Sequence, residues 1–155
     1  LRRHKAECLL KMREICEEHF KDEFERLQTV PGVSGQSAMH IIAELGVDMS
    51  TFQTPAMLVG WAGLKPRNDE SNGKFKSRKT THGNKYLRKT LIEVSWPASK
   101  KKGCFYNKFS YHQIVVRRKG KLKVQVAIAR KILVAIWNIL SKGIPYIEYA
   151  KVEET

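Results

Sequence analysis

The segment from Leu122 to Ser141 constrains the fold more than any other part of the chain. Its spacing predicts a helix with apolar side chains around much of its circumference, and Gly120 and Gly143 bound it. A helix that is apolar on most sides must be covered by other elements. We therefore expect it to be the central core helix, around which the rest of the chain packs.

Helical periodicity continues through most of the remaining sequence. Apolar residues recur at three- and four-residue steps, and Gly and Pro separate the periodic stretches. The expected helices cover residues 3–28, 35–45, 54–63, 84–96, 105–118 and 122–141. Thr54 and Pro55 are typical of a helix start, and Pro97 is expected to interrupt the helix at 84–96. The predicted fold class is all-α.

The first predicted helix carries a narrow apolar stripe among balanced charges. The stripe comprises Leu9, Met12, Cys16, Phe20, Phe24 and Leu27. Two interpretations remain open for residues 1–28. The stripe can pair with a helix upstream of Leu1 or on another chain, as the end of a coiled coil. It can equally pack on the domain that follows, which we place at 29–146 with a tail at 147–155.

Residues 65–82 lack a helical period. They contain Pro66 and the pair Asn72-Gly73, and charged residues alternate with Phe75. Asn-Gly between short strands is the strongest two-residue hairpin pattern. This segment is predicted to be an exposed irregular loop or short β-hairpin inserted into the helical domain.

The positive charge of the chain is confined to one region. The 155 residues carry a net charge of +14, and residues 65–130 hold nineteen basic and three acidic side chains, whereas residues 29–64 contain no Lys or Arg. A segregated cation excess is typical of a polyanion-binding surface. We therefore predict DNA or structured RNA as the partner. The alternatives are a merely soluble basic surface and an acidic protein partner.

The predicted nucleic-acid contacts fall into two groups. The Pro31-Gly32 turn between two helices suggests a helix-hairpin-helix element, in which Gly32 lets the backbone approach a phosphate. A plain turn between two helices is the alternative. The basic loop and the following helix supply side chains that reach phosphates, interleaved with Phe75 and Tyr86 for base stacking. These basic residues are Arg67, Lys74, Lys76, Arg78, Lys79, Lys85, Arg88 and Lys89.

Ser71 is the candidate nucleophile. A serine hydroxyl needs a base or neighbouring cations to attack a phosphate, and Arg67, Arg78 and Arg88 are possible sources of that charge. On its own, a serine in a loop is ordinarily a turn residue.

Other chemistry finds little support in the sequence. The histidines are scattered and acids are sparse, so no metal site is predicted in this chain. Three unpaired cysteines fit a reducing, cytoplasmic compartment. The most apolar run, 132–140, is too short to span a membrane, so we expect no membrane association.

Five blocks of sequence occur in an order that resembles a known family. They are Val-Pro-Gly-Val at 30–33, Ile-Ile-Ala-Glu-Leu-Gly at 41–46, Trp-Ala-Gly-Leu-Lys-Pro-Arg at 61–67, Gly-Asn-Lys-Tyr-Leu-Arg-Lys at 83–89 and Ala-Ile-Ala-Arg-Lys-Ile-Leu at 127–133. Together they resemble the carboxy-terminal transposase domain of the insertion-sequence one-ten family, also called one-ten/one-sixteen/nine-oh-two. The resemblance covers about residues 27–146.

The resemblance implies a larger, multimeric enzyme. Its members have an amino-terminal RuvC-like domain whose acidic residues bind magnesium, a coiled-coil connection and a domain like this one. A bridge RNA guides them to DNA, and a serine forms a covalent phosphoserine. Ser71 matches that serine, although Asn72 separates it from Gly73, which leaves Ser77 as a second candidate.

On this resemblance, the isolated chain should bind nucleic acid without being active, because the acids that hold the metal are absent. The alternative function is a non-catalytic helix-hairpin-helix module of a repair or recombination protein.

Overall fold

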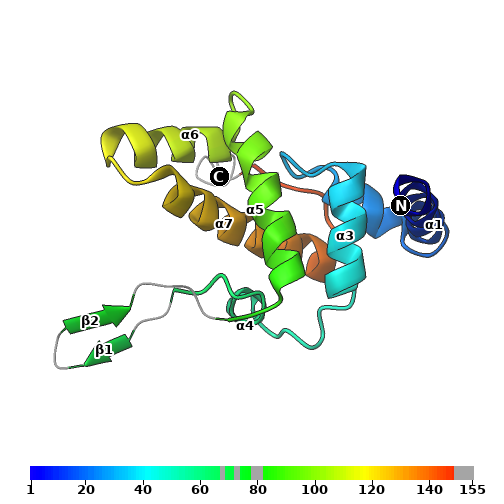
Figure 1. Cartoon of the computed structure of the whole chain (residues 1–155), viewed down its shortest axis with the longest axis horizontal. Coiled ribbons are helices and arrows are strands. Elements are labelled where there is room, and N and C mark those ends of the chain that lie inside the picture. Colours follow the sequence, from blue (N-terminus) through cyan, green and yellow to red (C-terminus); the bar gives the residue numbers. More distant parts are fainter. Residues whose placement is uncertain (67–68, 72–73, 78–81, 149–155) are drawn as a thin grey trace.

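The computed structural model describes residues 1–66, 69–71, 74–77 and 82–148, the two short segments by their backbone alone. These residues form seven α-helices, one π-helical turn and a two-stranded antiparallel hairpin. The predicted all-α fold with a small β-hairpin insertion is confirmed. Helices α5 (Lys85–Lys100) and α7 (Lys121–Lys142) cross at the centre of the bundle, and α3 (Gly35–Leu45) packs against α5 (Figure 1).

Helix α7 forms the core, as its composition predicted. It contacts α5, α4 (Pro55–Trp61), α2 (Lys21–Leu27) and α6 (Phe105–Tyr111). Ile128, Ile132, Leu133 and Ile136 have no exposed surface, and each such side chain contributes about 1.5–3 kcal/mol when buried. By length and composition α7 would pass for a membrane span, but half of that stretch is buried inside the protein, as expected of a core helix.

Side-chain caps set the beginnings of the middle helices. The Ser34 hydroxyl accepts a hydrogen bond from the Ser37 amide at the start of α3 (3.2 Å), and the Thr54 hydroxyl accepts one from the Met57 amide at the start of α4 (3.4 Å). Such caps replace a partner that the first helical amides lack. Both helices therefore begin where the sequence predicted.

The prediction of one continuous helix over residues 3–28 is wrong, because two helices occupy this segment. The chain leaves helical geometry at Phe20 (φ −132°), which separates α1 (Arg2–His19) from α2. The break turns α2 so that Phe24 and Leu27 enter the core, where both are buried. Helix α1 lies against α3, so the predicted stripe packs on its own chain.

The interruption expected at Pro97 is also wrong, because α5 continues to Lys100. Pro97 lies on the exposed side of α5, so the hydrogen bond that its ring nitrogen cannot donate is lost beside water rather than in the core. On the opposite side, the Ser95 hydroxyl donates a hydrogen bond to the Gln125 side-chain oxygen (2.8 Å). The Gln125 side-chain nitrogen donates one to the Ser99 hydroxyl (3.4 Å). These buried contacts align α5 with α7.

The segment predicted as one helix over residues 105–118 consists of an α-helix followed by a π-helical turn. Helix α6 passes into the π-helical turn η1 (His112–Val116) before the chain enters α7. Figure 1 shows α6 beside the upper end of α5, with the chain returning from its far end into α7.

Candidate nucleic-acid interface

A β-hairpin arm projects from the helical bundle between α4 and α5 (Figure 1). Strand β1 (Asp69–Ser71) pairs with β2 (Lys74–Ser77), and the register places Ser71 opposite Lys74. The predicted hairpin is confirmed by this pairing. Its predicted turn at Asn72 and Gly73 lies outside the described residues and stays a prediction.

The two candidate serines lie at opposite ends of the arm. Ser71 is the last paired residue before the turn, whereas Ser77 pairs with Asp69 at the end nearer the bundle. Two residues of β1, or three of the bulged β2, separate these levels by roughly 7–10 Å. The arm therefore offers Ser71 at its tip and Ser77 near its base.

A backbone clamp holds the base of the arm. The Asn84 amide donates to the Trp61 carbonyl (3.2 Å), which joins the segment entering the arm to the one leaving it. Gly83 crosses Gly63 so closely that a Cβ on Gly83 would lie 2.6 Å from the carbonyl carbon of Ala62. Real Cβ contacts are not that short, so only glycine fits at this crossing. The clamp was not predicted from the sequence. The only signal there was that Gly63 precedes the arm and the pair Gly83-Asn84 follows it.

Asn84 connects this clamp to two helices. Its side-chain oxygen accepts hydrogen bonds from the Tyr86 and Leu87 amides (both 3.0 Å) and so caps α5. Its side-chain nitrogen donates to Glu44 in α3 (3.0 Å). The arm is therefore attached to a helix end that is itself fixed to the bundle.

Three of the predicted contact residues lie together on the first turns of α5, directly after the arm. Lys85, Arg88 and Lys89 line one shallow, open depression with Ile92 and Glu93. The Lys85 ammonium lies 5.1 Å from the centre of the Tyr86 ring, which is 61% exposed. An exposed ring beside cations suits the stacking predicted for Tyr86.

The remaining predicted residues are placed differently. Lys74 and Lys76 belong to β2, which brings them into the arm. Arg67, Arg78 and Lys79 lie outside the described residues, so their proposed contacts stay predictions.

Gly32 does not join this group. It packs against the other half of α5, where a Cβ would lie 2.6 Å from the Val94 carbonyl oxygen and 2.8 Å from the Ala98 nitrogen. That point is roughly 9–15 Å along the α5 axis from Arg88. Its positive φ of 87° and the turn are as expected, but the close approach that the glycine permits is to a helix of its own chain. Phosphate binding by this helix-hairpin-helix turn stays a prediction.

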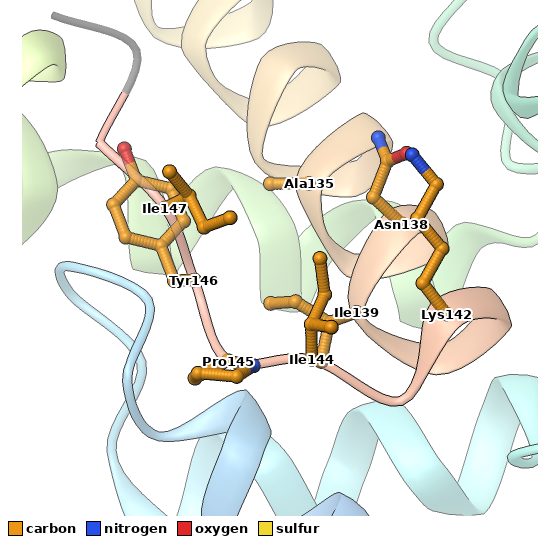
Figure 2. Close-up of a pocket in the computed structure, with 8 residues that line it drawn as sticks. All are labelled: Ala135, Asn138, Ile139, Lys142, Ile144, Pro145, Tyr146 and Ile147. Carbon is orange, nitrogen blue, oxygen red and sulfur yellow. The ribbon is translucent and has the colours of Figure 1, made fainter. Parts of the chain in front are cut away.

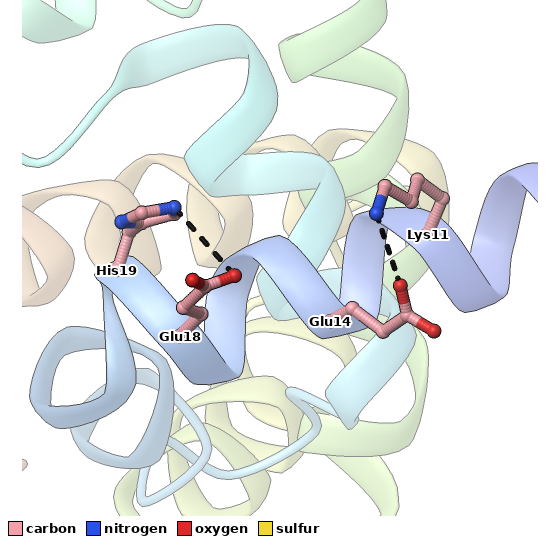
Figure 3. Close-up of polar contacts among 4 residues, drawn as sticks. All are labelled: Lys11, Glu14, Glu18 and His19. Carbon is pink, nitrogen blue, oxygen red and sulfur yellow. Dashed lines mark hydrogen bonds and ion pairs between the residues drawn. The ribbon is translucent and has the colours of Figure 1, made fainter.

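Carboxylates pair with several cations of α1, whereas of the three α5 cations beside the arm only Lys89 is paired with a described carboxylate, that of Glu93 (3.9 Å). Five of the six ion pairs among the described residues lie within α1 or at its end, including Lys11 with Glu14 (3.2 Å) and His19 with Glu18 (3.8 Å), as Figure 3 shows. The cations of α1 are therefore compensated locally, and this helix is a weaker candidate for binding a polyanion.

A second depression lies at the carboxy-terminal end of α7 (Figure 2). Its walls are mostly apolar, and the segment after the helix, including Ile144 and Tyr146, passes beside Ala135 and Ile139. Lys142 is the only charged residue lining it. This depression does not resemble a phosphate-binding surface.

No group of three or more His, Cys, Asp and Glu side chains gathers within the described part of the chain. The first turns of α5 present Lys85, Arg88 and Lys89 beside the base of the arm, a local cation excess of the kind that attracts polyanions.

The sequence model of the Transposase IS116/IS110/IS902 family matches residues 24–110, which include the clamp, the arm and α5. This is more than half of the chain, and the chain belongs to this transposase family. Two relatives are the pilin gene-inverting proteins of Moraxella bovis and Moraxella lacunata, each 29% identical in an alignment of 127 residues that covers 77% of this chain. The chain spans 37% of the length of each relative.

Proposed function

We propose that this chain is the DNA-binding, serine-bearing carboxy-terminal part of a transposase that cuts and rejoins DNA strands. The observation that carries the proposal is the family match, which coincides with a clamped arm beside the cations of α5. The names of the relatives describe inversion of a gene, and inversion requires strands to be broken and joined. DNA is therefore the proposed partner, in the cytoplasm.

Ser71 is the proposed nucleophile. Its hydroxyl oxygen would attack a backbone phosphorus, forming a serine–phosphate ester as the bond to one sugar oxygen breaks. The serine proton passes to a base, and the departing sugar oxygen takes up a proton. Rejoining reverses these steps with a sugar hydroxyl of another strand. A position at the tip of an arm lets the backbone at Ser71 approach a duplex without moving the bundle.

Cations beside the arm support this chemistry. Lys85, Arg88 and Lys89 would bind phosphates flanking the reacting one and so hold the strand in place. Magnesium on the acidic residues of an amino-terminal RuvC-like domain would stabilise the charge on the phosphoryl group. The proposal places that metal, a guide RNA and a multimeric assembly outside this chain, which by itself should bind nucleic acid and remain inactive.

The decisive experiment uses the full-length protein with its RNA, magnesium and labelled donor and target DNA. After denaturation, the wild type should give a DNA-linked protein band that is lost in Ser71→Ala and retained in the matched control Ser77→Ala. A band that persists in Ser71→Ala and disappears in Ser77→Ala would assign the nucleophile to the base of the arm. If the assembled wild type binds DNA but forms no adduct, the chain is a non-catalytic binding module instead.

A further inference from the structure

The corner between α6 and α7, residues 111–123, is a second unusual surface and is called the α6–α7 corner below. It contains the π-helical turn η1 and Arg118, whose φ of 49° is the only positive value at a non-glycine residue in the described ranges. The Arg117 amide donates to the His112 carbonyl and the Lys119 amide to the Gln113 carbonyl (both 3.0 Å). Strained backbone and π-helical turns concentrate at functional sites.

Among the described side chains, no carboxylate forms an ion pair with the cations of this corner. Each of these cations is exposed; they are Arg117, Arg118, Lys119, Lys121 and Lys123. From residue 94 to 147 the chain contains twelve Lys and Arg and no Asp or Glu. Net attraction for a polyanion is therefore stronger here than at α1, where carboxylates face the cations.

Apolar side chains lie among these cations. Tyr111 is 63% exposed, Val115 53%, Val116 60% and Leu122 73%. Four of the twelve exposed large hydrophobic side chains in the described ranges thus fall within twelve residues. Exposed apolar groups gathered in this way mark an interaction surface.

We propose that the α6–α7 corner is a second DNA contact, which binds a duplex at a kinked base step. The cations would bind phosphates on both sides of the step, and Val115, Val116 or Leu122 would insert between its base pairs. Proteins that kink DNA commonly combine basic and apolar contacts in this way. The proposal rests on the proposed function, because it requires this chain to bind DNA.

This surface is separate from the one beside the arm. It begins after residue 110, where the match to the family ends, and it belongs to other elements than the clamp. The far end of α6 and the arm nevertheless lie toward the same end of the longest axis of the molecule (Figure 1). One DNA partner can therefore engage both.

The charge prediction is tested by fluorescence anisotropy with a labelled 20-base-pair duplex between about 50 and 200 mM salt. The corner variant is Arg117→Gln/Arg118→Gln/Lys121→Gln. Its matched control is Arg3→Gln/Lys11→Gln/Arg13→Gln, which removes the same charge from ion-paired residues of α1. The slope of log affinity against log salt should fall by about 2.7 in the corner variant, or 0.9 per lost contact, and by much less in the control. Equal slopes in the two variants, or a corner slope like the wild type, would overturn the proposal; the second outcome would favour an acidic protein partner.

The wedge is tested with Val115→Ser/Val116→Ser, whose sites are exposed and so should leave folding intact. The wild type should bind a duplex with a two-nucleotide bulge severalfold more tightly than a straight one, and the variant should lose this preference. An unchanged preference would refute insertion. Lys85→Gln/Lys89→Gln separates the two proposals. If binding depends on salt and only this variant weakens it, the proposed function stands and the corner proposal is rejected. If the wild type binds neither duplex, DNA binding by this chain is rejected altogether.

Discussion

Replacing Gly32 with alanine separates two roles for the Pro31-Gly32 turn. If the glycine serves packing, Gly32→Ala should unfold the protein more easily and leave the DNA affinity of the folded molecules unchanged. If it serves phosphate binding, affinity should fall with little change in stability. The contact between Gly32 and α5 favours the first outcome.

The expected magnitude has two parts. A positive φ of 87° costs an alanine about 1–2 kcal/mol. The new Cβ would also meet Val94 and Ala98 at 2.6–2.9 Å, and overpacking of this kind costs about 1–3 kcal/mol. We therefore expect Gly32→Ala to lose about 2–5 kcal/mol, which lowers Tm on the order of 10 °C in a chain of this length.

Two other glycines provide matched controls. Gly46 has a φ of 75° and a ψ of −173°, a backbone conformation that almost only glycine adopts, and nothing lies within 4 Å of a built Cβ. Gly46→Ala therefore isolates a backbone penalty of about 1–3 kcal/mol. Gly60 lies inside α4 with open space around it, so Gly60→Ala should stabilise by about 0.5–1 kcal/mol. Urea unfolding followed by circular dichroism gives all three free energies. Anisotropy on labelled duplex, measured well below Tm, gives affinity. A Gly32→Ala protein with wild-type stability and weakened binding would refute the packing argument.

Two further predictions concern the Asn84 side chain and the thiols. Asn84→Ala removes the cap of α5 and the hydrogen bond to Glu44, so urea unfolding should show a loss of about 1–2 kcal/mol; an unchanged midpoint would contradict a stabilising role for these side-chain contacts. Cys8 is exposed and Cys16 is buried, and burial raises the pKa of the Cys16 thiol. A thiol reagent at neutral pH should therefore label Cys8 at once and Cys16 only in denaturant, as mass spectrometry would show. Labelling at equal rates would mean that α1 detaches from α3.

The structure also separates residues that the sequence grouped as nucleic-acid contacts by charge or by a turn motif. Lys85, Arg88 and Lys89 do lie together, because residues three and four apart share one face of α5. Gly32 lies elsewhere, since a turn motif does not reveal which neighbour its open backbone approaches. The α6–α7 corner was part of the same cationic block in the sequence, and only the exposure of its side chains distinguishes it.

The helix pattern was readable from the sequence because it depends on neighbours a few residues away. The apolar period of α7, the Ser34 and Thr54 caps and the pairing of β1 with β2 all depend on residues within one helical turn or one hairpin. Contacts between distant segments decided the rest. The bend at Phe20 follows from the burial of α2, and the clamp brings Gly63 beside Gly83 across the whole arm. Packing energy between segments far apart in the chain has no local pattern, so these features appear only once the helices are assembled.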